Sequence, residues 1–305
     1  MPKAYVFTRN GGPEVEGFAD LERPKPGPGE LLVAVRAAGV NPVDWKLRTG
    51  YTRPGSEPLP FPAVFGSEAA GTVVETGPGA EGFAPGDEVF GNPLTGGYAE
   101  YTLMPVAVTA HKPAALSFTD AAVLPVAAAT AYDGLRQLDL APGATLLVTG
   151  AGGGVGSAAV QLARHAGLRV LGAASAAKKD FVESLGAEHI PSGAGLADRV
   201  RAAAPEGVDA VFDLVGGDTL REAATLTDPA ALISAGGKPL VTELGGAPVR
   251  RARTAAVLDE VARLTVEGVL RTHVTRTVSL DRAAEALRAV EDGHALGKTV
   301  IEVTA

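Results

Sequence analysis

Short apolar stretches separated by proline and glycine dominate the first third of the chain. Residues 31–35 form one such stretch, residues 69–75 a second, and residues 87–90 a third that follows a Pro-Gly turn. Short strands with turn signals between them are typical of small barrel-like β folds. We therefore expect a compact β domain at the start of the chain.

The pattern changes near Ser117, where apolar strands begin to alternate with helical stretches. Strands are expected at residues 145–149, 169–173, 209–213 and 239–242, with a weaker one at 188–191. Between the first two, residues 154–166 place small and apolar side chains on one helical face. This alternation indicates βαβ units and a parallel sheet. After Arg271 the pattern predicts a strand, a helix over 281–292 capped by Ser279, and a last strand over 299–303.

A glycine cluster stands at the turn between the first of these strands and its helix. Residues 146–156 read Leu-Leu-Val-Thr-Gly-Ala-Gly-Gly-Gly-Val-Gly. In such a turn, backbone N–H groups at the helix start can bind a pyrophosphate, and glycines let the chain approach it closely. The residues expected to do so are Gly152, Gly153, Gly154 and Val155. An ordinary tight turn is the alternative, but the strand, the helix and the next strand favour dinucleotide binding.

The end of the second strand indicates which dinucleotide. NAD enzymes usually place an acidic residue there for the ribose 2′-hydroxyl. Residues 157–179 contain no Asp or Glu, whereas Ser175, Lys178 and Lys179 suit a 2′-phosphate. We therefore expect NADPH as cofactor; the alternative is that the two lysines open a solvated helix.

Composition narrows the class of protein. The 305 residues carry a net charge of −8, which argues against a nucleic-acid partner. No apolar run approaches the roughly 18 residues of a membrane span, and no signal peptide is recognised, so a cytoplasmic protein is expected. The chain has no cysteine, which excludes disulfides, thiol catalysis and thiolate-bound zinc, and its five histidines lack metal-ligand spacing.

Ordered motifs along the whole chain resemble one family. They are Asn-Pro-Val-Asp-Trp-Lys-Leu-Arg-Thr-Gly at 41–50, Phe-Gly-Ser-Glu-Ala-Ala-Gly at 65–71, Pro-Gly-Asp-Glu-Val at 85–89, Ala-Thr-Ala-Tyr at 129–132, the glycine loop with Gln-Leu-Ala at 161–163, Ser-Leu-Gly-Ala at 184–187 and Gly-Lys-Thr-Val at 297–300. With these, the chain resembles the zinc-independent quinone oxidoreductase (ζ-crystallin-like) branch of the medium-chain dehydrogenase/reductase superfamily.

The resemblance implies an α/β protein with two domains. A GroES-like β-barrel catalytic domain would comprise residues 1–120 and 271–305, and a Rossmann domain with a doubly wound parallel sheet would comprise residues 121–270. Relatives pair through the sheet edge, so the strand expected at 239–242 would make a homodimer.

The resemblance also implies a site without metal. Zinc-dependent relatives carry Cys where this chain has Asn41 and His where it has Ser67, and Glu68 alone does not hold zinc. Many bacterial quinone reductases have Tyr in place of Lys46, so this chain looks closer to the enone and alkenal reductases.

Hydride transfer to an activated acceptor needs only a donor at the acceptor's carbonyl oxygen. The expected substrate is therefore a small quinone or an α,β-unsaturated carbonyl compound. We expect Asn41 to orient it and Lys46 to polarise it; a turn and a solvated side chain are the alternatives for these two residues. An enoyl-thioester or biosynthetic tailoring reductase and a non-catalytic NADPH-binding protein stay open as other functions.

Further residues are assigned by their expected positions. The resemblance places Thr130 beside the nicotinamide ribose or phosphates; the alternative is a helix residue that faces the seam between the domains. Val215, Gly216, Leu244 and Gly245 follow expected strands and would line the nicotinamide side, because ligands bind beyond the carboxyl ends of parallel strands. Trp45 and Phe65 would wall an apolar acceptor pocket, with core packing as the alternative. Asp213 is expected to be structural.

Overall fold

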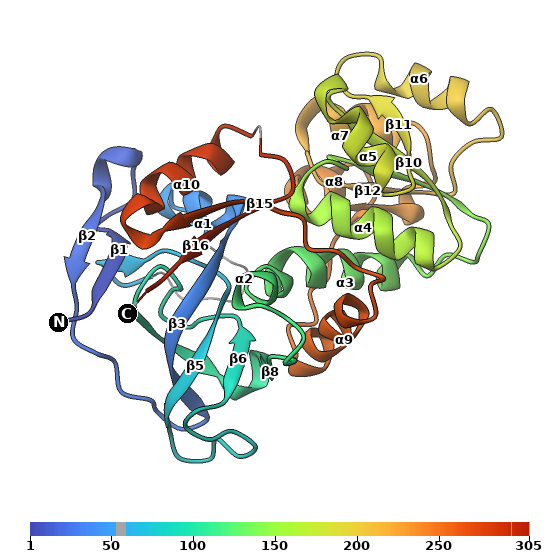
Figure 1. The fold of residues 1–305 in the computed structure, drawn as a ribbon. Helices are drawn as coiled ribbons and strands as arrows, with labels where there is room; N and C mark the ends of the chain where they lie inside the picture. Colours follow the sequence, from blue (N-terminus) through green and yellow to red (C-terminus); the bar gives the residue numbers. More distant parts are fainter. Residues whose placement is uncertain (53–58, 294, 305) are drawn as a thin grey trace. The chain divides into compact units, whose positions relative to one another are not determined.

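The computed structural model describes residues 1–52, 59–293 and 295–304, and the chain divides into two compact units (Figure 1). The first unit comprises Met1–Val126, Arg253–Val266 and Val274–Ala305, and the second comprises Ala127–Ala252 and Glu267–His273. Residues 253–266, expected in the nucleotide-binding domain, belong instead to the first unit, where helix α9 (Ala255–Val266) contacts strand β8 (Thr109–His111).

Two sheets build the first unit. The larger runs in the order β15 (Val274–Ser279), β16 (Lys298–Glu302), β3 (Glu30–Val40), β5 (Ala69–Thr76), β6 (Glu88–Gly91) and β8, with β7 (Tyr101–Pro105) also paired to β3. The smaller consists of β2 (Glu16–Asp20), β1 (Lys3–Phe7) and β4 (Ala63–Val64). Strand β3 is longer than predicted because it pairs with β16, β5 and β7 along its length.

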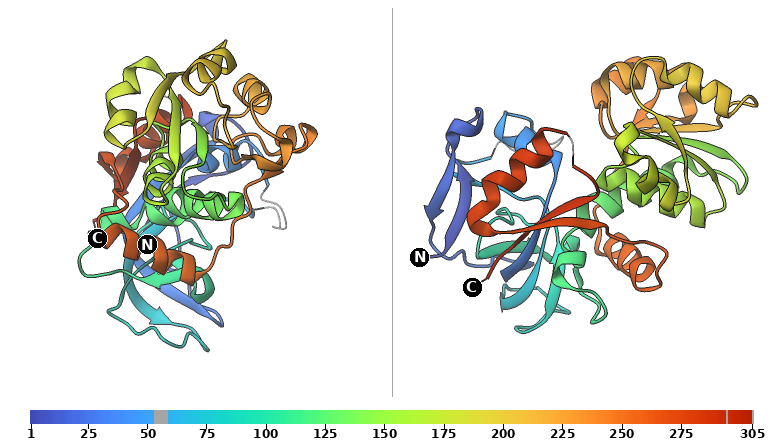
Figure 2. Two further views of the ribbon diagram at one scale, coloured as in Figure 1. Left: turned by 90° about the vertical axis from the view of Figure 1, so that its right-hand side faces the viewer. Right: turned by 45° about the horizontal axis from the view of Figure 1, so that its top comes forward.

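Helices cover this unit at a few places. They are α1 (Pro42–Arg48), α2 (Phe118–Ala121), α9 and α10 (Ala283–Glu291), with short 3-10 turns at Pro13–Val15, Val106–Val108 and Leu280–Arg282. Helix α10 packs on both α1 and β16, as two views of the ribbon show (Figures 1 and 2). Because β3 ends where α1 begins, this packing fixes the segment that carries Asn41 and Lys46.

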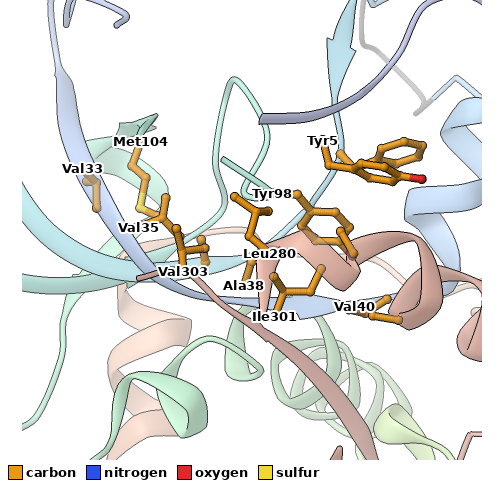
Figure 3. Packing of buried hydrophobic residues seen from close by; sticks show 14 of the residues in the cluster. Tyr5, Val33, Val35, Ala38, Val40, Tyr98, Met104, Leu280, Ile301 and Val303 are labelled. Carbon is orange, nitrogen blue, oxygen red and sulfur yellow. The ribbon is translucent and has the colours of Figure 1, made fainter. Parts of the chain in front are cut away.

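Alternating side chains of the long strands form the core of the first unit (Figure 3). Val33, Val35 and Ala38 of β3 and Ile301 of β16 are buried in one cluster with Leu280, which precedes α10. The alternation in β3 and β16 therefore buries one face of the sheet beneath α10.

The second unit is a six-stranded parallel sheet. Its order is β11 (Glu188–Pro191), β10 (Arg169–Ala174), β9 (Thr145–Thr149), β12 (Ala210–Asp213), β13 (Leu232–Ser234) and β14 (Ala247–Pro248). Its α-helices are α3 (Ala129–Leu138), α4 (Gly154–His165), α5 (Lys179–Ser184), α6 (Leu196–Ala203), α7 (Gly217–Ala224) and α8 (Lys238–Glu243). Short 3-10 turns at Ala176–Lys178 and Pro229–Ala231 complete this unit, and a π-helical segment at Leu124–Ala128 spans the boundary at which the chain passes from the first unit into the second. The predicted Rossmann-like sheet is confirmed, with β9 and β12 side by side where the strand order reverses.

One predicted strand of this sheet is wrong. Residues 239–242 lie in helix α8, where Pro239 occupies the first turn and Val241 is buried. A short apolar run fits a strand or a buried helical turn equally well, and proline is tolerated in the first turn of a helix. The sheet edge is instead formed by β14, which has only two residues, so the strand expected to mediate dimerisation does not exist.

No helix in the described ranges is both long enough and apolar enough to cross a membrane.

Candidate active site

The glycine loop joins β9 to α4 and presents backbone donors. Gly153 precedes the helix, and its carbonyl accepts the N–H of Ser157 at 2.8 Å. As at the start of any α-helix, the N–H groups of residues 154–156 have no carbonyl within the helix to bond. Such N–H groups, together with the positive end of the helix dipole, suit the binding of an anion.

Close backbone packing gives this loop its shape. A methyl group on Gly156 would overlap the carbonyl oxygen of Gly150 and approach the Cα of Ala151 to 2.6 Å, so only glycine fits. A Cβ on Gly152 would lie 2.5 Å from the Cδ of Lys178. The loop is therefore a cradle of bare backbone that fits a dinucleotide pyrophosphate.

The predicted 2′-phosphate residues follow β10 at the same edge of the sheet. Ser175 is exposed, and its carbonyl accepts the N–H of Lys178 at 2.9 Å. The stem of Lys178 rests over Gly152, and burial lowers the pKa of its ammonium group. The exposed Lys179 donates to Glu183 at 2.5 Å, a hydrogen bond that raises the pKa of Lys179. The sheet thus brings Lys178 next to the glycine loop, while Lys179 is turned to its own helix.

Asp213 organises the loops after three neighbouring strands. It is fully buried and accepts the hydroxyls of Thr149, which ends β9, and Ser234, which ends β13, each at 2.6 Å. It also accepts the backbone N–H groups of Val215 at 3.2 Å and Gly216 at 3.0 Å. Asp213 is therefore structural, as predicted, and it leaves the side chain of Val215 53% exposed beyond the strand end.

Leu244 and Gly245 do not lie where we expected them. They follow helix α8 rather than a strand, and a Cβ on Gly245 would lie 3.1 Å from Pro229, which precedes β13. The next residue, Gly246, faces the carbonyl of Leu232, the first residue of β13. Both predicted residues are therefore at the amino end of the strands, away from the carboxyl edge where ligands bind.

Thr130 lies in the first turn of α3 and is buried. Its hydroxyl accepts from Arg251 at 2.6 Å, and Arg251 also donates to Asp133 at 2.9 Å. Arg251 follows β14, the strand that the sequence analysis had misplaced. Correct placement of β13 and β14 would have pointed to Ser234 and Arg251 at the carboxyl edge.

In the first unit, the strand register brings three distant residues together. Asn41 follows the end of β3, Lys298 begins β16, and Glu68 immediately precedes β5. Both β16 and β5 run antiparallel to β3, pairing Thr299 with Val40 and Ala69 with Ala38. The three side chains therefore emerge at the same end of the sheet.

These three side chains form a buried polar cluster. The Lys298 ammonium donates to the Asn41 Oδ1 at 2.7 Å, the Glu68 Oε1 at 2.8 Å and the Val40 carbonyl at 3.1 Å. The Asn41 amide donates to the Glu68 Oε1 at 2.7 Å, and Glu68 also accepts the N–H of Val126 at 2.7 Å. We call Asn41, Glu68 and Lys298 the ammonium cluster.

Room for this cluster is made by a small residue. A methyl group on Gly39 would overlap the Glu68 carboxylate and lie 2.8 Å from the carbonyl of Ala122. Because Gly39 has no side chain, the Glu68 carboxylate can pack directly against the backbone of β3 at this position.

Asp44 fixes the start of α1 beside the cluster. It is fully buried, and its carboxylate accepts the N–H of Asn41 at 2.9 Å, the hydroxyl of Ser67 at 2.6 Å and that of Tyr98 at 3.0 Å. Burial raises the pKa of Asp44, and the hydrogen bonds counteract part of that rise. Asn41 is therefore held through both its backbone and its side chain.

The other end of α1 is held by Arg48. This side chain is 1% exposed and forms ion pairs with Glu16 and, at 2.6 Å, with Glu291 of α10. Between these two anchors, the Lys46 ammonium lies 5.6 Å from the ring centre of the half-buried Trp45. Lys46 and Trp45 thus stand on a helix fixed at both ends.

Phe65 belongs to the core. It is 2% exposed, and its ring centre lies 5.5 Å from that of Tyr5 and 4.8 Å from that of Phe7. It does not wall a pocket, and the alternative of core packing holds for this residue.

Lys298 is the member of the ammonium cluster that was not predicted as a site residue from the sequence. It entered only as part of a family motif, although it opens a strand with an apolar centre, Lys-Thr-Val-Ile-Glu. A lysine is almost never fully buried unless it is paired, so its place in such a strand was the available signal.

Among residues 1–52, 59–293 and 295–304, no group of three or more His, Cys, Asp or Glu side chains is placed to hold a metal ion. The side-chain oxygens of Asn41 and Glu68 accept hydrogen bonds from the Lys298 ammonium group instead.

Comparison with known families matches both parts of the chain. The alcohol dehydrogenase GroES-like domain matches residues 27–114, and the zinc-binding dehydrogenase family matches residues 185–301. Among curated proteins, the chain is 33% identical over 311 residues to the chloroplastic quinone-oxidoreductase QR1 of Triphysaria versicolor, covering 92% of this chain and 91% of that protein.

A second kind of relative is far larger. The chain is 37% identical over 309 residues to the pikromycin polyketide synthase component PikAII of Streptomyces venezuelae, covering 93% of this chain but only 8% of the synthase. The sequence thus spans a small part of that relative's length.

Solved structures have the same fold. The quinone oxidoreductase from Coxiella burnetii superposes with a TM-score of 0.89 at 30% identity, covering 99% of both chains. A mycobacterial protein solved in complex with NADPH superposes with a TM-score of 0.86 at 30% identity, covering 99% of this chain and 100% of that one.

Proposed function

We propose that this chain, which belongs to the quinone oxidoreductase family of the medium-chain dehydrogenase/reductase superfamily, is an NADPH-dependent reductase of quinones or of α,β-unsaturated carbonyl compounds that works without a metal. The observation that carries the proposal is the glycine cradle at the switch point of a parallel sheet, with Lys178 lying over Gly152. Oxidoreductases of this superfamily use a pyridine nucleotide. The choice of NADPH and the class of acceptor are our inference.

The second unit would hold the cofactor. The N–H groups of Gly154 and Val155 would bind the pyrophosphate, with Gly152 and Gly153 providing close approach. Ser175, Lys178 and Lys179 would hold the 2′-phosphate, with Lys178 best placed of the three. Thr130, Val215 and Gly216 would contact the nicotinamide side. When bound, NADPH supplies the hydride.

The first unit would hold the acceptor at the start of α1. A quinone or an enone needs a hydrogen-bond donor at the carbonyl oxygen where negative charge develops. Asn41 has one amide N–H directed to Glu68, and the nearest acceptor found for its amide besides Glu68, the Gly39 carbonyl, lies at 3.5 Å, too long for an effective bond. The second N–H would orient the acceptor, Lys46 would polarise it or deliver a proton, and Trp45 would form an apolar wall.

A biosynthetic reductase of enoyl thioesters is the second candidate. The observation that favours it is the 37% identity to a segment of a polyketide synthase over 93% of this chain. The chemistry is the same conjugate reduction, so a thioester in the acceptor panel separates the two candidates.

The first experiment measures NADPH and NADH oxidation with a benzoquinone, a naphthoquinone, an alkenal, a cyclic enone and an enoyl thioester. We expect turnover with NADPH and one acceptor class clearly ahead. Tight NADPH binding without turnover of any acceptor would contradict the proposal and favour a non-catalytic NADPH-binding protein.

Cofactor choice has its own test. Lys178→Ala should weaken NADPH binding by about tenfold, because it removes a charge-assisted hydrogen bond to the 2′-phosphate, and should leave NADH binding unchanged. Arg201→Ala, which removes one positive charge from the exposed face of α6, is the matched control and should change neither. Equal weakening of both nucleotides by Lys178→Ala would contradict the assignment.

We also propose that the chain forms a homodimer, as its resemblance implies. One of the two edges of the parallel sheet is β14, and an open edge generally needs covering. A monomeric mass in solution would refute this.

A further inference from the structure

We propose that the Lys298 ammonium is the fixed cation of the candidate active site and acts as a positioning residue that sets the orientation of the Asn41 amide. This inference rests on the proposed function for its kinetic consequence. Its structural part, the orientation of the amide, can be measured without turnover.

The hydrogen-bonding capacity of the ammonium is completely used. A lysine ammonium has three N–H donors, and three oxygens lie within 3.1 Å of the Lys298 Nζ, one each from Val40, Asn41 and Glu68. The side chains of Lys298 and Glu68 are 5% and 0% exposed. A buried lysine with three well-placed acceptors is a built site rather than a surface ion pair.

The neighbours of Asn41 leave only one orientation for its amide. An ammonium can only donate, so the amide oxygen must face Lys298. An ionised carboxylate can only accept, so the amide nitrogen must face Glu68. Both constraints are met at once at 2.7 Å, and a flipped amide would place N–H against ammonium and oxygen against carboxylate. The two charges therefore fix which way the remaining N–H points.

The cluster also has the arrangement of a cation site. Positions 41, 67 and 68 are those at which the resemblance places Cys, His and Glu in zinc-dependent relatives, and Lys298 contacts the side chains at two of them. Ser67 is turned to Asp44 instead. The positive charge that a metal would bring is here supplied by a residue of the chain itself, at the far end of the sequence.

A purely structural ion pair and a positioning residue differ in what a double substitution does. Replacing Lys298 by Met leaves Glu68 buried without its counter-charge, which is strongly destabilising, whereas removing both charges is often nearly neutral. The double variant Lys298→Met/Glu68→Gln should therefore recover stability. It should not recover rate, because neither neighbour then dictates the orientation of the Asn41 amide.

The experiment compares wild type, Lys298→Met, the double variant and Lys112→Met. Lys112 is the matched control, since its side chain is 4% exposed and paired with Glu88 at 2.9 Å in the same unit. We expect the double variant to unfold near the wild-type denaturant midpoint, with kcat lowered about 100-fold and the NADPH KM unchanged. Lys112→Met should lose stability but keep kcat within about twofold.

A second readout is independent of turnover. In ¹⁵N-labelled protein, the Asn41 side-chain N–H directed to Glu68, assigned by its loss in Asn41→Asp, should exchange slowly in wild type and rapidly in the double variant. Recovery of both kcat and slow exchange in the double variant would overturn the inference. If wild type showed slow exchange that the double variant lost, but neither turned over any acceptor, the proposed function would fail and the positioning would stand.

Discussion

Two buried carboxylates, one in each unit, are satisfied in opposite ways. Asp213 accepts two hydroxyls and two backbone N–H groups, all neutral donors contributed by strand ends and the turn that follows. Glu68 accepts an ammonium, an amide and one backbone N–H. Both are fully buried.

The difference shows how each unit uses a charge. Asp213 joins three loops at the carboxyl edge of a parallel sheet, so it shapes the rim of the nucleotide cradle without adding a cation there. Glu68 holds the Lys298 ammonium beside Asn41, where negative charge would develop on an acceptor. Asp213 therefore fixes the conformation of loops, whereas Glu68 fixes the position of a positive charge.

The largest effect should come from breaking the charged pair. Glu68→Gln leaves the Lys298 ammonium buried without a carboxylate and should lower the free energy of unfolding by about 4 kcal/mol. Urea denaturation measures it, and adding Lys298→Met should restore most of the loss. A loss that the second substitution deepens would show that the two charges do not balance each other.

A steric change in the cradle should come next. Gly156→Ala forces a methyl group into the Gly150 carbonyl and should cost about 3 kcal/mol, because the backbone of the turn must shift. Gly153→Ala is the matched control for stability, since its nearest neighbour outside the adjacent residues would lie at 3.4 Å, an ordinary contact. Similar denaturant midpoints for the two variants would contradict the close packing of the loop.

The Asp213 site, whose hydrogen-bond donors are all neutral, should lose less stability on substitution. Asp213→Asn keeps one acceptor oxygen but turns an NH₂ group towards donors, and should cost about 2 kcal/mol. Unlike Glu68→Gln, no single substitution of a cation elsewhere should rescue it, because no cation among the described residues bonds to Asp213. If a substitution of a charged residue restored the stability of Asp213→Asn, the proposed difference between the Asp213 and Glu68 sites would be contradicted.

The smallest effect concerns pH in the second unit. Burial, and then the nearby Arg271, lower the pKa of His273 below 6.5, so the unfolded chain binds a proton more readily. Stability is therefore complete above this unfolded pKa and is lost as pH falls through it towards the folded pKa. Between about pH 7.5 and 5.5, wild type should lose more stability than His273→Asn, a variant that tolerates the positive φ of this residue. Parallel losses in urea midpoints would contradict it.

Features that depend on contiguous residues were predicted from the sequence. The strand before the glycine loop, the helix after it and the next strand are present as β9, α4 and β10. Asp213 was also expected to be structural, and its hydrogen bonds to Thr149, Ser234 and the Val215–Gly216 turn agree with that role. Strand β13 was missed because three residues carry too little periodicity, and α8 was taken for a strand because an apolar run of four fits both.

The ammonium cluster could not be predicted in this way. Glu68 and Lys298 are 230 positions apart, and they meet only because β16 and β5 flank β3 in one register. That pairing order is a property of the whole sheet, so no local pattern gives it. Likewise, the packing of α9 with the first unit depends on tertiary contacts that its own amphipathic pattern does not specify.

The proposed metal-free reduction is tested most directly by acceptor-dependent NADPH oxidation by the wild-type chain, before and after exhaustive dialysis against a metal chelator. We expect turnover of a quinone, an enone or an enoyl thioester at an unchanged rate after dialysis. Loss of turnover on dialysis that returns with added zinc would contradict it.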